Sequence, residues 1–162
     1  MNPMSILLLL PLNGDTREQL KVNKRWGTTP NILICKASQT ARETIEEAAK
    51  YWQRHGFKVG TISSGNDEQA CQMTEPLKRG YIIFMGSKGL DTKRHYAITQ
   101  PWYRRSTQKM VSASIRVQEE YSNNLKLITH ELGHALGLLH VDDKNSVMYE
   151  WHRYEVKQHT TR

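Results

Sequence analysis

The spacing of apolar and polar residues from residue 31 onward predicts a series of short strands and two longer helices. Short apolar runs, and stretches in which apolar and polar residues alternate, are typical of strands. They predict strands over 31–35, 58–62, 81–85, 96–99 and 110–117. The polar stretch over 63–80 contains Gly65 and Pro76 and predicts a surface loop. This order favours a sheet flanked by helices, in an α+β fold.

The first helix is predicted to follow the strand at 31–35. Its apolar residues recur at helical spacing and form one stripe, made of Ala41, Ile45, Ala48, Ala49 and Trp52. Thr40 and Glu43 have the spacing of a capping box, in which each side chain bonds a backbone N–H group at the start of the helix. Gly56 is a typical end point because glycine adopts positive φ easily.

The second helix is predicted to begin near Asn124, with Ser122 or Asn123 as its N-cap. On a helical wheel its apolar stripe lies roughly opposite His130 and His134. The stripe consists of Leu125, Ile128, Leu132, Ala135 and Leu136. We therefore expect the stripe to face the core and the two imidazoles to face a cleft.

Residues 1–30 are expected to form an apolar N-terminal segment and a connector, with the main domain over 31–162. Met4–Leu12 is apolar but far too short to span a bilayer, and it lacks a basic leader and a small-residue cleavage site. It is either a strand packed on the body or a degenerate secretion signal. Secretion is expected only in the second case, and an intracellular location otherwise. Residues 13–30 are polar and predict the connector.

The length and the charge set outer bounds on the class of protein. A chain of 162 residues suits one domain with a core of its own, and we expect a monomer. The 23 Lys and Arg against 16 Asp and Glu give a formal charge of +7. The basic residues are scattered, and no nucleic-acid fold motif accompanies the densest group, which consists of Lys93, Arg94, Arg104 and Arg105. A solvated basic face is therefore favoured over a nucleic-acid site.

The chain has two cysteines, Cys35 and Cys71. They could form one disulfide or stay separate thiols, and their spacing does not decide between the two. Cys35 ends an apolar run, so we expect it to pack in the core.

The stretch from His130 to His140 carries the strongest chemical pattern in the chain, with His130, Glu131, His134, Gly137 and His140 at fixed spacings. On a helix, His130 and His134 lie one turn apart on nearly the same side, so both rings can reach one cation. Gly137 follows where the helix must end and turn, which requires a residue that tolerates positive φ. The turn can then bring His140 to the same metal from another direction.

Three protein ligands leave one position of a tetrahedral zinc ion open, which distinguishes a catalytic site from a structural one. The open position would hold a water whose pKa falls to about 7. Glu131, next to the first ligand, is placed to take a proton from that water and return it to the leaving amine. The pattern predicts metal-assisted hydrolysis.

The same run, together with Ser146, Val147, Met148 and Tyr149, resembles the extended zinc signature and Met-turn of the metzincin metallopeptidases. A histidine as the third ligand, a methionine eight residues later and a tyrosine directly after it are most similar to the matrixin branch. The resemblance covers about 31–149. It implies a mixed twisted sheet with two main helices, the active-site helix being followed by the Met-turn. It also implies that Met148 forms an apolar floor beneath the zinc.

Two differences from the matrixin pattern change the expectations. The segment over 86–110 lacks the Gly- and Asp-rich loop and the histidines that hold further ions in that family, so we expect one zinc and no calcium. Asp91 and His95 are interpreted as surface polar residues rather than an ion site. Only 13 residues follow Tyr149, so the long C-terminal helix is expected to be short or missing. In that segment Trp151, Tyr154 and Val156 are expected to pack under the turn or to wall a specificity pocket.

The sequence therefore predicts a zinc-dependent endopeptidase that acts on a peptide or protein substrate. His130, His134 and His140 would bind the metal, Glu131 would be the general base and acid, and Met148 would lie below the metal. The alternative is a non-catalytic zinc-site protein that binds a protein or polyanion partner. Glu131 argues against this alternative, because binding alone requires no base beside the metal.

Overall fold

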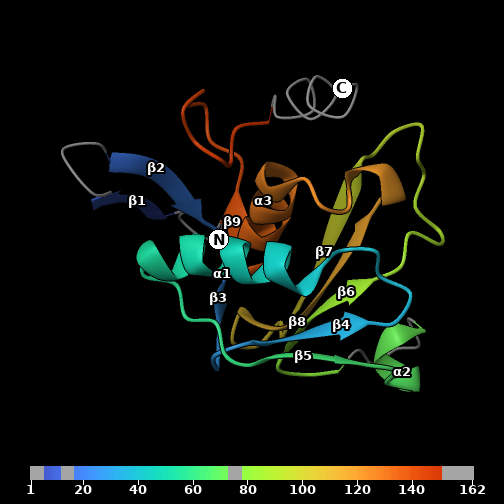
Figure 1. Ribbon diagram of the computed structural model, residues 1–162. Helices are drawn as coiled ribbons and strands as arrows, with labels where there is room; N and C mark the ends of the chain where they lie inside the picture. The colour runs from blue at the N-terminus through green and yellow to red at the C-terminus, as the bar shows by residue number, and fades with distance from the viewer. Residues whose placement is uncertain (1–5, 12–16, 73–77, 151–162) are drawn as a thin grey trace.

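The computed structural model describes residues 6–11, 17–72 and 78–150 of the chain, and Figure 1 shows a twisted sheet with two helices above it. The centre of the sheet is formed by three parallel strands, β4 (Asn31–Cys35), β6 (Tyr81–Met85) and β8 (Lys109–Val117). Most residues of these three strands are buried, as expected for strands covered on both faces. The predicted strands at 31–35, 81–85 and 110–117 are therefore confirmed.

Three further strands complete the main sheet. β5 (Ile62–Gly65) pairs parallel with β4, and β3 (Arg25–Trp26) pairs parallel with β8. β7 (Ala97–Tyr103) pairs antiparallel with β8, which makes the sheet mixed. The edge strand predicted at 96–99 is confirmed, although it extends through Pro101 to Tyr103, where a loop was expected.

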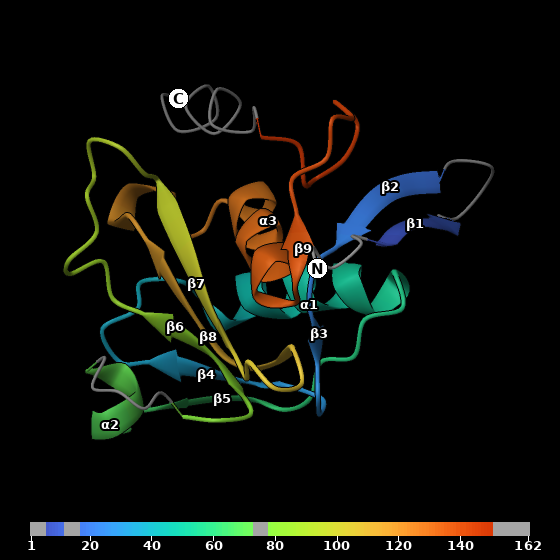
Figure 2. The ribbon, with the colours of Figure 1, turned by 180° about the vertical axis from the view of Figure 1, so that it is seen from behind.

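The two main helices, α1 (Arg42–Arg54) and α3 (Leu125–Ala135), pack on each other and on the same face of the sheet (Figure 2). Alternate residues of β4 and β6 point to this face and form one core with the helices, among them Ile32, Ile34, Ile82 and Phe84. The opposite face is covered by α2 (Glu68–Cys71), where Leu33, Cys35, Ala70, Ile83 and Met85 form a second, smaller cluster. The α+β fold expected from the sequence is confirmed.

Cys35 and Cys71 form a disulfide, which settles the alternative that the sequence left open. The bond joins the end of β4 to the last residue of α2 and closes a loop of 36 residues. It therefore attaches α2 to the sheet on the face opposite the two main helices.

Three local predictions are wrong. The strand expected at 58–62 lies at 62–65, because residues 57–61 instead lead the chain from α1 back to the sheet edge. The capping box of Thr40 and Glu43 does not form, since Ala41 is the N-cap and its N–H donates to Oδ1 of Asn123. The loop expected at 63–80 contains most of β5 and all of α2.

Residues 17–26 were expected to belong to an irregular connector, and this prediction is also wrong. They form β2 (Arg17–Val22) and β3, and Leu20 and Val22 are buried in the main core. β2 pairs on one side with β1 (Ile6–Pro11) and on the other with β9 (Leu138–Leu139), all antiparallel. The domain boundary at residue 30 stays a prediction.

Among the described residues, no helix combines the length and the apolar composition that a membrane span requires. A short 3-10 turn, η1 (Glu119–Tyr121), links β8 to α3.

Candidate metal centre

Helix α3 carries two of the three candidate ligands and begins with a side-chain cap. Asn124 is the N-cap, and its Oδ1 accepts a hydrogen bond from the N–H of Leu127 at 3.0 Å. The predicted start of the helix is correct, but the cap lies one or two residues after the predicted Asn123 or Ser122. Leu127, Ile128, Leu132 and Ala135 are buried against α1 and the sheet. The helix is therefore anchored with His130 and His134 on its remaining face.

Gly137 ends the helix with φ of +104°, as the sequence predicted. A Cβ atom at this position would lie 1.9 Å from the carbonyl oxygen of Lys24, so glycine is required for two reasons. The carbonyl of Gly137 accepts hydrogen bonds from the N–H groups of Asn23 and Lys24, at 2.9 and 3.2 Å. The N-terminal strands thus hold the turn that leads to β9 and His140.

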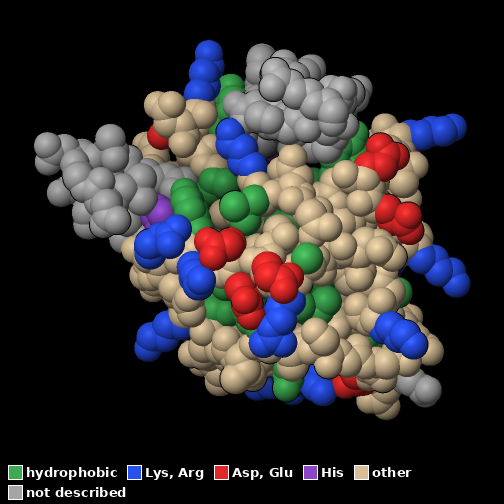
Figure 3. Space-filling model, viewed as in Figure 1, with side chains coloured by type: hydrophobic (Ala, Val, Ile, Leu, Met, Phe, Trp, Pro, Cys, Tyr) green, Lys and Arg blue, Asp and Glu red, His purple; other side chains and the backbone are tan. Residues whose placement is uncertain are grey.

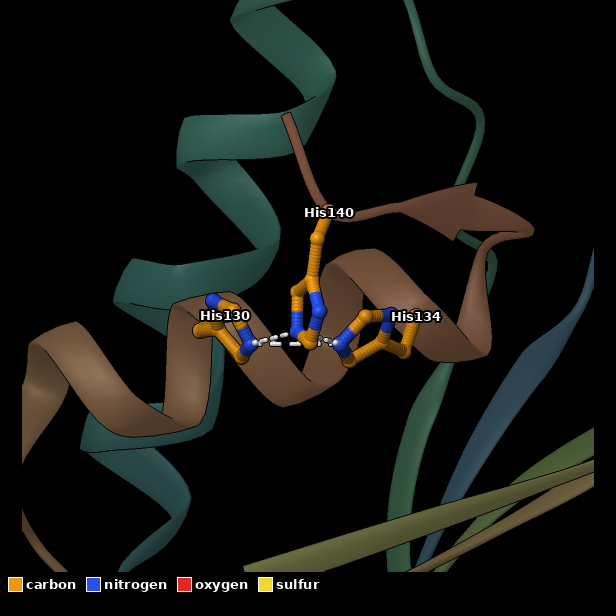
Figure 4. A group of neighbouring side chains, drawn as sticks. All are labelled: His130, His134 and His140. Atoms are coloured by element: carbon orange, nitrogen blue, oxygen red, sulfur yellow. Dashed lines mark hydrogen bonds between the residues drawn. The ribbon is translucent and has the colours of Figure 1, made fainter. Parts of the chain in front are cut away.

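The three histidines converge on one point, as Figure 4 shows. Their Nε2 atoms lie 3.1 Å apart for His130 and His134, 3.1 Å for His134 and His140, and 3.2 Å for His130 and His140. Two rings come from α3 and the third comes from the segment after β9. Among the residues that the structure describes, this is the one group of three or more His, Cys, Asp or Glu side chains close enough to share a metal ion.

Backbone carbonyls fix which nitrogen of each helical histidine faces this point. Nδ1 of His130 lies 2.7 Å from the carbonyl oxygen of Val147, and Nδ1 of His134 lies 2.8 Å from that of Leu138. A carbonyl can only accept, so Nδ1 carries the proton and Nε2 presents a lone pair. Burial lowers the pKa of His134, while the bond to Leu138 partly opposes this shift. The neutral imidazole, which is the form that binds metal, is favoured.

This arrangement fits a zinc ion. Lone pairs that face one another at about 3 Å repel unless a cation lies between them. A tetrahedral zinc with Zn–N bonds of about 2.0–2.1 Å places its nitrogen ligands about 3.3 Å apart, close to the separations found here. The donor set of three neutral imidazoles suits zinc and leaves room for a fourth ligand. The three residues can therefore hold the metal that the sequence pattern predicted.

Glu131 is buried beside the first histidine, with 7% of its surface exposed. Its carboxylate oxygen Oε2 lies 2.5 Å from the hydroxyl oxygen of Thr99 on β7. The same hydroxyl lies 3.1 Å from the backbone oxygen of Glu131. Nothing in the sequence marks Thr99 as part of the site, because a threonine in a strand is ordinary and only the packing of β7 on α3 brings it to the carboxylate.

Met148 is fully buried. A Cβ atom on Gly133 would lie 2.5 Å from the sulfur of Met148 and 2.7 Å from Cζ2 of Trp52. Gly133 therefore allows the methionine and the tryptophan to approach the helix backbone between the two histidine ligands. Ser146, which is also fully buried, accepts a hydrogen bond from the N–H of Met148 at 3.1 Å. The hydrogen bond between these two residues thus stabilises the turn that carries Met148.

An open pocket of about 180 Å³ lies over the three histidines. β7 forms one wall of this pocket and α3 the other. Its lining residues other than the histidines are Tyr96, Ala97, Ile98, Thr99, Leu127, Glu131 and Glu150. A second pocket, of about 190 Å³, shares Thr99 and His134 with the first and extends toward Lys24 and Gly137. The point between the three Nε2 atoms can therefore be reached from solvent through these pockets.

The remaining candidates lie elsewhere. The carboxylate of Asp91 accepts a hydrogen bond from the N–H of Lys93 and forms an ion pair with Arg94, as is typical of a residue in a surface turn. Trp151, Tyr154 and Val156 lie outside the described residues. On the face of the molecule in Figure 3, Lys and Arg side chains are spread out, with Asp and Glu side chains among them.

Comparison with known families agrees with this geometry. The family model for matrixin, a peptidase family, matches residues 63–162, which is 100 of the 162 residues. The chain belongs to the matrixin family, as the sequence resemblance indicated, and it has the α+β fold of a metzincin-like domain. Its type is that of a zinc metallopeptidase, and the family implies zinc and peptide or protein substrates. No curated protein was found to match the chain.

Proposed function

We propose that this protein is a zinc-dependent endopeptidase that hydrolyses peptide bonds within a peptide or protein substrate. One observation carries the proposal. The Nε2 atoms of the three histidines lie within 3.2 Å of one another. The buried carboxylate of Glu131, on α3, lines the same pocket as the histidines. A binding site for a metal requires the three histidines but not the carboxylate.

His130, His134 and His140 would hold the metal through Nε2, and their Nδ1 bonds would keep the first two rings in the required tautomer. When bound, zinc lowers the pKa of a water molecule to about 7 and polarises a carbonyl oxygen. Glu131 takes one proton from the attacking water as the water oxygen bonds to the carbonyl carbon of the substrate. Glu131 then gives that proton to the amine nitrogen as the C–N bond breaks.

The substrate would bind as an added strand along β7. Residues 96–99 line the pocket over the histidines, and in the described residues β7 pairs with β8 alone. Its other edge can therefore supply backbone hydrogen bonds to an extended peptide, while pockets select side chains. This mode of binding suits a bond in the interior of a chain and supports endopeptidase rather than terminal cleavage.

Replacing Glu131 with Gln tests the proposal. The change keeps the size of the side chain but removes the base, so we expect cleavage of a diverse peptide library to fall by roughly 10²–10⁴-fold. Bound zinc, measured by elemental analysis, should stay near one ion per chain. Glu119→Gln, at an exposed glutamate in η1, is the matched control and should cleave as the unchanged protein does.

The outcomes separate the two interpretations of the sequence. Equal cleavage by Glu131→Gln and the unchanged protein would overturn the proposed role of Glu131. A protein that binds one zinc and cleaves no peptide of the library would instead support the non-catalytic alternative. Loss of cleavage when a chelator removes the metal, and recovery when zinc is added, are both expected.

A further inference from the structure

The hydroxyl of Thr99 lies within hydrogen-bond distance of the carboxylate of Glu131, the proposed base. Its oxygen lies 2.5 Å from Oε2 of Glu131, shorter than the usual 2.7–2.8 Å between two oxygens. Bonds of 2.5–2.7 Å are typical where a hydroxyl donates to an ionised carboxylate, and they are stronger than bonds between neutral groups. The contact therefore has the geometry of a charge-assisted hydrogen bond.

The hydroxyl has one proton and two acceptors within reach, both on Glu131. The backbone oxygen lies at 3.1 Å and the carboxylate oxygen at 2.5 Å. The nearer and charged acceptor takes the proton when Glu131 is ionised. Thr99 thus contacts both the carboxylate and the backbone oxygen of Glu131.

Register places Thr99 at this position. Thr99 pairs with Ile115 of β8, which is fully buried in the core. A shift of the strand by one residue would bring Ile98 or Gln100 to the carboxylate, because it would turn every side chain of β7 to the opposite face of the sheet. Strand β7 also packs directly on α3. The hydroxyl is therefore held by the sheet while the carboxylate is held by the helix.

We propose that Thr99 is a positioning residue that fixes the orientation of the Glu131 carboxylate toward the attacking water. This proposal rests on the proposed function, because it assigns a role to Thr99 through the base. A carboxylate can rotate about its last side-chain bond, and only some orientations present an oxygen to the water. The bond from Thr99 limits this rotation, so Glu131 does not need to be reoriented at each turnover.

The same residue belongs to the strand along which the substrate is expected to bind. Thr99 lines both pockets, the one over the histidines and the one that extends toward Lys24. Its backbone would contact the peptide while its side chain contacts the base. A shift of β7 would therefore displace both the bound peptide and the hydroxyl that orients the base.

The test compares Thr99→Val, Thr99→Ser and Thr129→Val. Valine keeps the shape of threonine and removes the hydroxyl, whereas serine keeps the hydroxyl. We expect kcat of Thr99→Val to fall roughly 10- to 100-fold with KM within about twofold, as for the loss of a bond to a charged group. Thr99→Ser should recover most of the loss. The control, Thr129→Val, removes a hydroxyl on α3 that donates to the backbone oxygen of Leu125. Thr129 lines neither pocket, so the kcat of this variant should change little.

A second measurement does not depend on activity. The carboxylate stretching bands of metal-free protein, recorded by infrared spectroscopy, should shift between the unchanged protein and Thr99→Val. The shift should be absent when the same substitution is made in a Glu131→Gln background, because the carboxylate is then missing. Bound zinc should stay near one ion per chain in every Thr99 variant.

The results distinguish failure of this proposal from failure of the proposed function. If the unchanged protein cleaves peptides and Thr99→Val matches it in kcat, Thr99 does not position the base. An equal loss in Thr99→Ser, or an infrared shift that persists without the Glu131 carboxylate, would also overturn the proposal. If the unchanged protein cleaves no peptide, the proposed function fails, and the infrared comparison alone then decides whether Thr99 bonds Glu131.

Discussion

Two regions that lie far apart in the sequence meet at the metal centre and contribute to it differently. Residues 125–148 supply the three histidines, Glu131 and the buried Met148. Residues 17–26 supply no ligand, but they pair with β9 and hold the carbonyl of Gly137 through two backbone hydrogen bonds. One region carries the candidate ligands and the proposed base, and the other fixes the turn that brings His140 to His130 and His134.

The placement of the third candidate ligand, His140, depends on tertiary structure in a way that the placement of His130 and His134 does not. His130 and His134 are one helical turn apart, so the helix alone places them. His140 reaches the same point only if the chain reverses at Gly137 and continues along β2. We therefore expect damage to the N-terminal strands to reach the metal site mainly through His140.

The largest effect is expected from Gly137→Ala, where the two regions touch. The new Cβ would lie 1.9 Å from the carbonyl oxygen of Lys24, and φ of +104° is unfavourable for alanine. We expect a loss of about 4 kcal/mol or more in the free energy of unfolding, together with weaker zinc binding. Gly56→Ala is the matched control. Gly56 also has positive φ, but nothing lies within 4 Å of its Cβ position, so its cost should be roughly 1–2 kcal/mol.

Chemical denaturation and zinc titration would measure both variants. Similar losses for Gly137→Ala and Gly56→Ala would mean that backbone conformation alone matters at Gly137. The contact between the turn and Lys24 would then contribute little to the site.

The next effect is expected at the disulfide, which lies away from both regions. Replacing Cys35 and Cys71 with serine opens a loop of 36 residues and should lower the free energy of unfolding by about 3–4 kcal/mol. Zinc stoichiometry at temperatures well below unfolding should not change, because the bond is on the face of the sheet opposite α3. Loss of zinc from the folded variant would show that the metal centre depends on more of the fold than these two regions.

Leu20→Ala tests the N-terminal strands by themselves. Leu20 is fully buried, and the change should cost about 2–5 kcal/mol. Since β2 pairs with β9, we expect zinc affinity to fall as well, even though no ligand is altered. Leu125→Ala, at a leucine that is 47% exposed, is the control and should cost about 0.5 kcal/mol or less. Unchanged zinc affinity in Leu20→Ala would contradict the role given to residues 17–26.

The smallest effect is expected from Asn124→Ala, which changes only the start of α3. Loss of the hydrogen bond from Leu127 to the cap should cost about 1 kcal/mol, as measured by denaturation. Zinc affinity should change little, because His130 and His134 lie more than one turn inside the helix. Asn66→Ala, at an exposed residue after β5, is the control. A large loss of zinc would mean that the helix frays as far as the first ligand.

The sequence predicted the parts of the site that depend on local spacing. The helix positions of His130 and His134, the reversal at Gly137 and the strands at 31–35 and 81–85 all follow from periods of 3.6 and 2 or from glycine. These features need no knowledge of what packs against them. The pattern of the histidines, Glu131 and Met148 also carried the family resemblance that the matrixin match confirms.

The parts that could not be predicted depend on contacts between distant residues. The oxygen that bonds the N–H of Ala41 belongs to Asn123, 82 residues away, so the capping box expected from Thr40 and Glu43 was wrong. Thr99 reaches Glu131 only because β7 packs on α3. The strand at 17–22 exists because β9 and β1 pair with it, although its own residues read as a polar connector. Strand pairing between residues that are far apart in the sequence produces no periodic pattern of apolar and polar residues in the chain.

Diffraction from zinc-loaded crystals, recorded at wavelengths on both sides of the zinc absorption edge, would show directly whether the three histidines hold the metal. We expect one anomalous peak within bonding distance of Nε2 of His130, His134 and His140, with Glu131 beside it and no fourth protein ligand. A peak at another place, or a fourth side chain that completes the coordination shell, would contradict the proposed catalytic zinc site.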